Sequence, residues 1–250
     1  MENVLIIDNY DSFTYNLAHY VAANSGYTVD VYRNDEISIA DVGHYNTIIL
    51  SPGPGLPKDA GILNQVVQQY APTKKILGVC LGMQAIAEVF GGTLTNLNTV
   101  FHGVATPIRV LDSSDLLFKN LPSTFDVGRY HSWVVDKEKI PQSLQITAID
   151  ANNQMMALKH RQYQLYGVQF HPEVTHTLQG GRILEHFILS ISACEALWTP
   201  SHIAEDAIKT IREQVGSDHV LLGLSGGVDS SNHKGSYFSN RFAKRMAPAG

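Results

Sequence analysis

The sequence predicts an α/β protein with a doubly wound, mixed but mainly parallel sheet and helices on both faces. Two observations predict this fold class. Through the first ninety residues, short apolar runs alternate with segments of helical spacing, as in parallel strands joined by crossover helices. From about residue 93, shorter strands joined by polar turns take over, which indicates a partly antiparallel continuation of the sheet.

The elements follow in order from these patterns. In the first part we expect strands at 3–8, 28–32, 47–50 and 76–79, and helices after residue 12 and at 62–70 and 83–90. In the second part we expect strands at 107–111, 133–135, 144–149, 155–160 and 165–170, then an amphipathic helix at 181–193. Because ligands of parallel sheets bind beyond the carboxyl ends of the strands, loops at those ends are the first place to look for chemistry.

Composition narrows the function classes. The chain has 250 residues, 44% of them hydrophobic, and a net charge of −5, so we expect a globular protein without a general affinity for nucleic acid. Two cysteines, Cys80 and Cys194, make no disulfide framework and fit a reducing cytoplasm. No apolar run approaches the roughly 20 residues of a membrane span, and no leader precedes the first strand. We therefore expect a cytoplasmic protein with no membrane partner.

The segment 75–84 is the centre of the chemical argument. It predicts a buried strand, a sharp turn and a helix start, with Cys80 at the turn and Gly78 and Gly82 on either side. This is the spacing of a nucleophile elbow, with sulfur in place of a hydroxyl. The free N–H groups at the helix start favour a thiolate and can bind an oxyanion. The alternative is a small buried core cysteine.

A thiol nucleophile needs a base, and the base needs an orienting group. His171 and Glu173 follow a predicted strand and lie two residues apart, so both can face Cys80, with Glu173 orienting the imidazole. The alternative is a histidine at a strand end beside an unrelated acid. The two glycines of the loop Pro52-Gly53-Pro54-Gly55 have no side chains, so the backbone N–H groups of the loop could face a ligand. The alternative is an ordinary turn.

Several stretches together resemble one family, the class I (triad-type) glutamine amidotransferases, and within it the glutaminase subunits of anthranilate synthase and aminodeoxychorismate synthase. The stretches that carry the resemblance are 7–13, 51–55, 78–84, 102–103, 129–132 and 167–173. The resemblance implies a flavodoxin-like fold and hydrolysis of L-glutamine, with no cofactor and no metal. It also implies a chorismate-binding synthase subunit as partner, docked near the loop after Ser12 and the loop near His102.

The resemblance also implies residue roles. Cys80 would be the nucleophile, His171 the acid–base group and Glu173 its orienting partner. The oxyanion would be bound by the N–H groups of Gly53 and Leu81. Gly53 lies in the loop that also contains Pro54 and Gly55, and Leu81 directly follows Cys80. Glutamine would be held by the Gln84 side chain and by the backbone around Ser132 and Trp133, where the family more often carries leucine at the second position.

After Glu173 the sequence becomes similar to GMP synthetase, over residues 174–231. This similarity favours an alternative, the amidotransferase portion of a truncated or chimeric GMP synthetase. Within it, a loop resembles the pyrophosphate-binding loop of ATP pyrophosphatases, with Ser225, Gly226, Gly227, Asp229 and Ser230. The helix such a loop needs is missing, so we expect a remnant that does not bind ATP. A nucleotide-binding module and a different cysteine hydrolase stay open as further alternatives.

These observations predict three parts. Residues 1–193 are expected to form the amidotransferase domain, and residues 194–231 a linker with the truncated nucleotide-loop fragment. Residues 232–250 contain four basic residues and no acidic one, with no sustained apolar period, so we expect a disordered tail.

Overall fold

The computed structural model describes residues 3–25 and 27–193 of the chain. The predicted linker, the loop at 225–230 and the predicted tail at 232–250 lie outside the described residues. None of the helices within the described ranges combines the length and the hydropathy needed to cross a bilayer.

The described residues form a nine-stranded sheet with the order β2-β1-β3-β4-β9-β8-β7-β5-β6. The first five strands in this order are parallel to one another, and they are β2 (Val29–Arg33), β1 (Val4–Asp8), β3 (Thr47–Leu50), β4 (Lys75–Val79) and β9 (Leu165–Val168). The remaining strands pair antiparallel, and they are β8 (Met155–His160), β7 (Leu144–Asp150), β5 (Leu94–Val110) and β6 (Thr124–Val135). The mixed α/β class predicted from the sequence is confirmed.

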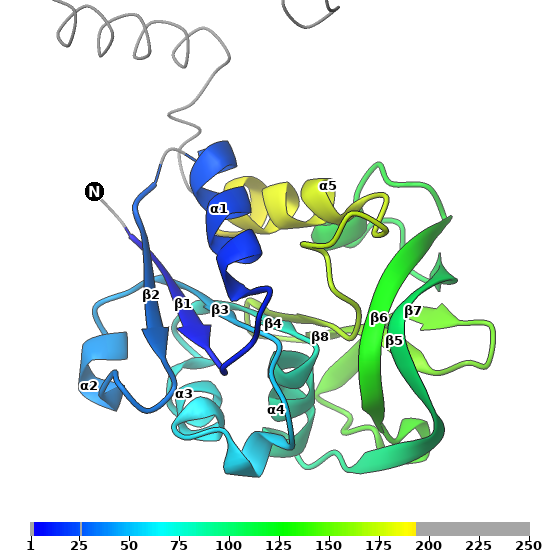
Figure 1. Cartoon of the computed structure of the whole chain (residues 1–250), viewed down its shortest axis with the longest axis horizontal. Coiled ribbons are helices and arrows are strands. Elements are labelled where there is room, and N and C mark those ends of the chain that lie inside the picture. The colour runs from blue at the N-terminus through cyan, green and yellow to red at the C-terminus, as the bar shows by residue number, and fades with distance from the viewer. Residues whose placement is uncertain (1–2, 26, 194–250) are drawn as a thin grey trace, which may run out of the picture. The chain divides into compact units, whose positions relative to one another are not determined.

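Helices cover both faces of the parallel half (Figure 1). Helices α1 (Thr14–Ser25) and α5 (Gly180–Glu185) lie on one face, and α3 (Leu63–Tyr70) and α4 (Leu81–Val89) lie on the other, with the short α2 (Ile39–Val42). Strand β1 shows why, because its apolar residues alternate between the two cores: Val4 and Ile6 pack in the first, Leu5 and Ile7 in the second.

The end of the described chain differs from the single helix predicted at 181–193. Helix α5 passes at His186 into a π-helix, η4 (His186–Ile191). Short 3-10 turns, η1 (Pro57–Asp59), η2 (Leu116–Phe118) and η3 (Lys137–Lys139), complete the described elements.

Strands β5 and β6 are much longer than the sequence predicted, since only 107–111 and 133–135 were expected. They pair over most of their length, with irregular register between Asn96 and Phe101 and between His102 and Val104. Strand β9 joins the two halves of the sheet, being parallel to β4 and antiparallel to β8. The carboxyl ends of β1, β3, β4 and β9 therefore open at one edge of the sheet, where the predicted site residues begin.

Candidate active site

Cys80 occupies a strained bend between β4 and α4. Its backbone has φ 50° and ψ −99°, a conformation that non-glycine residues seldom adopt and that costs about 1–3 kcal/mol. The Cys80 N–H donates to the Val168 carbonyl of β9 at 2.8 Å, which fixes the bend against the neighbouring strand. A Cβ atom added to Gly78 would lie 2.4 Å from the carbonyl carbon of Gly82, so the strand and the helix meet backbone to backbone. The predicted elbow is therefore present.

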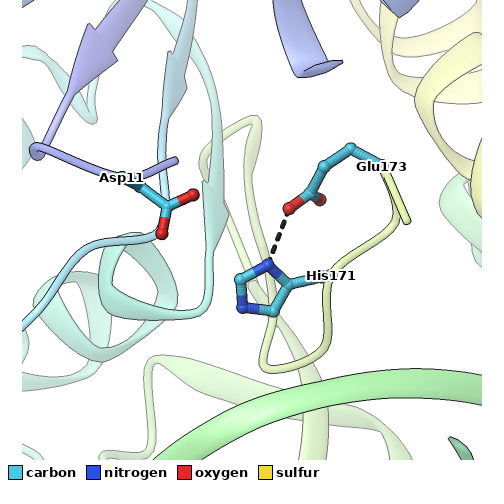
Figure 2. A group of neighbouring side chains, drawn as sticks. All are labelled: Asp11, His171 and Glu173. Carbon is cyan, nitrogen blue, oxygen red and sulfur yellow. Dashed lines mark hydrogen bonds and ion pairs between the residues drawn. The ribbon is translucent and has the colours of Figure 1, made fainter. Parts of the chain in front are cut away.

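His171 and Glu173 form a buried pair in the loop after β9. The His171 Nδ1 and Glu173 Oε1 atoms are 2.6 Å apart, and Figure 2 shows the carboxylate directed at the ring. The His171 backbone N–H donates to the Gly128 carbonyl of β6 at 3.0 Å. The rings of Phe13 and Tyr130 pack edge-on against the imidazole, with centroid distances of 5.8 and 5.1 Å. The ring orientation is thus fixed by an acid and by two aromatic neighbours.

The charge state of His171 follows from these contacts. Burial disfavours the charged ring, but Cys80 and Glu173 outweigh this effect and raise the pKa of His171 to about 10. Because Nδ1 is engaged by Glu173, Nε2 is the atom left for proton exchange with the sulfur. Nε2 is buried and makes no regular hydrogen bond to any described residue. The His171 ring therefore carries a proton at neutral pH next to Cys80.

Asp11, in the loop after β1, is a third ionisable group at this position (Figure 2). Asp11, His171 and Glu173 each bring one possible metal-ligand atom within 4.8 Å of the others. Burial raises the pKa of the Asp11 carboxyl, while the N–H of Phe13 and the nearby His171 oppose this effect. A cation would have to displace the proton shared by His171 and Glu173, so the arrangement suits acid–base chemistry better than a metal centre.

The loop after β3 lies against the start of α4, as the predicted oxyanion site requires. Asn9 ties the loop down, because its backbone N–H donates to Ser51 Oγ and its side-chain Nδ2 donates to the Ser51 carbonyl, both at 2.8 Å. A Cβ atom added to Gly53 would lie 2.5 Å from the Asn9 carbonyl and 2.9 Å from Leu81 Cδ2. Gly53 therefore lies against the side chain of Leu81, the residue that carries the second predicted N–H donor.

Beyond Gly53 the loop turns outward. Pro54 and Gly55 are exposed, and Gly55 has φ 77° with nothing within 4 Å of an added Cβ atom. These two residues shape the rim of the loop.

Three of the predicted glutamine-binding residues lie together. Gln84 is buried on α4, and its Nε2 donates to the Trp133 carbonyl at 2.9 Å. Ser132 is the residue before Trp133 on β6, and both are half-buried. The carbonyl contact involves only the Trp133 backbone, so it does not depend on the tryptophan side chain.

Gln169 is a site residue that the sequence analysis missed. It is fully buried directly after β9, its Oε1 accepts from Gln84 Nε2 at 3.3 Å, and its Nε2 donates to Cys80 Sγ at 3.5 Å. The available signal was an amide side chain inside the otherwise apolar run 165–170, because a buried amide needs partners.

These residues come from five distant segments, and their arrangement suits nucleophilic acyl transfer. Its parts are a cysteine at a helix start, an imidazole oriented by a carboxylate, and the backbone of the Gly53 loop beside the helix start.

Comparison with known proteins finds relatives that agree with one another in family and in fold. The model of the family "Glutamine amidotransferase class-I" matches residues 5–191. Anthranilate synthase component 2 of Lactococcus lactis is 44% identical over 191 residues, covering 76% of this chain and 95% of the relative. Aminodeoxychorismate synthase component 2 of Escherichia coli is 42% identical over 187 residues, covering 74% of this chain and 98% of the relative. A crystal structure of a glutamine amidotransferase from Thermotoga maritima shares the fold, with a TM-score of 0.65 at 14% identity over 76% of this chain and 98% of that chain.

Proposed function

The chain belongs to the class-I glutamine amidotransferases, and from this premise we propose that it hydrolyses L-glutamine through a triad of Cys80, His171 and Glu173. The observation that carries the proposal is the buried His171–Glu173 pair, at 2.6 Å, whose ring pKa is raised by the sulfur of Cys80. A histidine held in this way on an adjacent strand end is what a cysteine nucleophile requires.

In the first half-reaction the Cys80 thiolate attacks the side-chain amide carbon of glutamine. A bond forms between sulfur and carbon, and the amide oxygen takes up negative charge. The N–H groups of Gly53 and Leu81 stabilise this oxyanion, because they belong to a tied-down loop and to a helix start that contact each other. The carbon–nitrogen bond then breaks as His171 gives its proton to the leaving ammonia.

In the second half-reaction the glutamyl thioester is hydrolysed. His171, now neutral, takes a proton from water, and the resulting hydroxide adds to the thioester carbon. Collapse of the second tetrahedral intermediate releases glutamate and restores the thiolate beside the imidazolium. Glu173 holds the ring in the tautomer that presents Nε2 in both steps.

We assign substrate binding to the residues around Gln84. Gln84, Ser132 and Trp133 supply the side chain and the strand backbone that hold glutamine, since Gln84 joins α4 to the Trp133 carbonyl on β6.

The triad is tested by substitution. Cys80→Ser should abolish ammonia release from glutamine, and His171→Ala should reduce it by at least ~10²-fold, the usual contribution of a general acid–base group. Glu173→Ala should cost less, since it acts through the ring. The measurement is glutamate dehydrogenase-coupled ammonia release, with circular dichroism to show that each variant folds. If Cys80→Ser keeps its activity, or if Glu173→Ala is as severe as loss of the sulfur, these roles are wrong.

We further propose that the ammonia is delivered to a chorismate-aminating synthase subunit. Two relatives are by name second components of anthranilate and aminodeoxychorismate synthases. Ammonia released to water at neutral pH would become mostly ammonium, which is a poor nucleophile, so direct transfer is needed. The predicted docking loops support this proposal, because Phe13 and His102 both pack on the Tyr130 ring. Exposed Tyr15 lies on the helix that follows Phe13.

The partner is tested by measuring ammonia from glutamine with and without purified anthranilate synthase and aminodeoxychorismate synthase subunits. Stimulation by one subunit, with formation of its aminated product from chorismate and glutamine, is the expected result. Stimulation only by the nucleotide-amination domain of a GMP synthetase would instead support the alternative that the sequence at 174–231 suggests. Activity that none of these subunits changes would contradict a synthase partner.

A further inference from the structure

A continuous chain of buried polar groups runs from the Trp133 carbonyl on β6 to the sulfur of Cys80. Gln84 Nε2 lies 2.9 Å from the Trp133 carbonyl and 3.3 Å from Gln169 Oε1, and Gln169 Nε2 lies 3.5 Å from Cys80 Sγ. Gln84 and Gln169 are 3% and 0% exposed. Two buried amides in contact must orient each other, because any mismatch leaves an unpaired polar group.

The direction of each hydrogen bond in this chain follows from its first acceptor. A backbone carbonyl can only accept, so Gln84 must present its NH₂ group to Trp133. The same NH₂ group faces Gln169, which must therefore present its Oε1 atom. The remaining end of the Gln169 amide, the NH₂ group, then points at Cys80 and donates to the sulfur.

The other side of the Trp133 carbonyl is fixed just as strictly. Arg129 can only donate, and its Nε donates to His131 Nε2 at 3.1 Å while its Nη1 pairs with Asp150 at 2.8 Å. His131 must then carry its proton on Nδ1, which lies 3.2 Å from the Trp133 carbonyl and donates to it. Burial, together with the Arg129 charge, lowers the pKa of His131 to about 3, so this ring stays neutral. The Trp133 carbonyl therefore accepts two hydrogen bonds, one from Gln84 and one from His131.

We propose that Gln169 is a further catalytic residue, which donates its side-chain N–H to Sγ of Cys80 and stabilises the thiolate. The inference rests on the proposed nucleophilic role of Cys80. Hydrogen bonds to an ionised acceptor are about twice as strong as those between neutral groups, so a donor at this position favours the ionised sulfur over the thiol.

Ionisable groups also lie near this sulfur, and the test must separate their effect from that of Gln169. His171 approaches from the loop after β9 with Glu173 behind it, and Asp11 approaches the same ring from the loop after β1. Replacing Gln169 leaves all three in place.

The test is the rate at which iodoacetamide alkylates Cys80, because this reaction needs a thiolate and does not need bound glutamine. Mass spectrometry of the peptide that contains Cys80 separates it from Cys194. For Gln169→Met, which keeps the side-chain length and removes the donor, we expect the midpoint of the alkylation rate plotted against pH to rise by about one pH unit, because losing a charge-assisted hydrogen bond to the thiolate changes its ionisation equilibrium about tenfold. At pH 10, where an ordinary thiol is also ionised, the rates of variant and wild type should converge.

Two more variants complete the design. Gln164→Met makes the same substitution at an exposed position before β9 and should leave the rate unchanged. If Gln169→Met does not fold, Gln169→Asn retains an amide that is one methylene too short to reach the sulfur, and the same shift of the midpoint is expected. An unshifted midpoint of the pH profile in either folded Gln169 variant, or a rate difference that persists undiminished at pH 10, would overturn the proposal. Failure of the nucleophile assignment would look different, since Cys80→Ser would then still hydrolyse glutamine.

Discussion

His171 sets the upper end of the pH range in which the proposed triad can work. In the folded protein its pKa is raised to about 10, so the ring keeps its proton throughout the neutral range and loses it as the pH rises through that value. The protonated ring is needed to release ammonia. Ammonia release should therefore persist into alkaline solution and decline only near pH 10.

Glu173→Gln tests this assignment, because it retains a hydrogen-bond acceptor for Nδ1 but removes the charge that helps to raise the pKa of His171. The alkaline decline of kcat/KM should move to lower pH by about one unit or more, since a carboxylate next to a cation shifts its partner by about 1–3 units. Glu138→Gln, the same change at an exposed acid, should leave the pH profile unchanged. An alkaline limb that does not move in Glu173→Gln would show that Glu173 does not control the ring charge.

The sequence predicted the site residues that sit in local motifs, and it missed those that act through partners. Cys80 directly follows one strand, and His171 and Glu173 lie in the loop after another, so their position at the sheet edge could be inferred from the chain order. Gln169 could not be assigned in this way, since its role depends on the orientation of Gln84, and that orientation depends on a carbonyl of β6.

At the scale of elements, the bend between β4 and α4 depends on two glycines that leave room for neighbouring backbone. Cβ atoms added at Gly78 and Gly82 would lie 2.4 Å from the Gly82 carbonyl carbon and 2.6 Å from the Leu50 carbonyl oxygen. Backbone atoms cannot move aside as a side-chain tip can. Gly78→Ala and Gly82→Ala should each lower the free energy of unfolding by about 3 kcal/mol or more, as over-packed sites do.

Gly91→Ala is the matched control for these two substitutions. Gly91 has φ 98° but nothing within 4 Å of an added Cβ atom, so only its backbone conformation is penalised, by about 1–2 kcal/mol. Urea unfolding of the variants gives the comparison. Equal losses at all three positions would mean that backbone conformation, and not close approach, explains the glycines of the bend.

The β5–β6 ribbon shows why half of the fold could not be read fully from the sequence. Along β6 the buried positions 125, 127, 129 and 131 alternate as a strand should. Two of them are Arg129 and His131, which look like exposed residues in a sequence and are buried only because Asp150 and the Trp133 carbonyl pair with them. Most of β5 is exposed and has irregular register, so it lacks the apolar alternation that reveals a strand.

At the scale of the whole molecule, the site lies where the parallel and antiparallel halves of the sheet meet. The parallel half supplies the sulfur and the Gly53 loop at its strand ends, while β6 of the antiparallel half supplies the Trp133 carbonyl and anchors the His171 backbone. Strand β9 belongs to both halves and leads into Gln169, His171 and Glu173. Neither half contains a complete site, so we expect glutamine hydrolysis to require the whole sheet.

We propose that the amidotransferase domain consists of residues 1–193, with residues 194–231 and 232–250 as added segments that the chemistry does not need. The last described turn contributes Phe187, Ile188 and Ile191 to the core that α1 also enters through Leu17. Lys75 Nζ donates to the carbonyl of Ser192 at 3.2 Å. A chain that ends at residue 193 retains all of these contacts.

Two truncated chains test this boundary by thermal unfolding and ammonia release. The chain ending at residue 193 should match the full chain in Tm and in rate. The chain ending at residue 185 loses three buried apolar side chains, each worth about 1.5–3 kcal/mol, which together approach the whole stability of an ordinary domain. It should therefore be largely unfolded and inactive. A large loss of Tm on removal of residues 194–250 alone would place part of that segment within the folded domain and move the boundary toward the C-terminus.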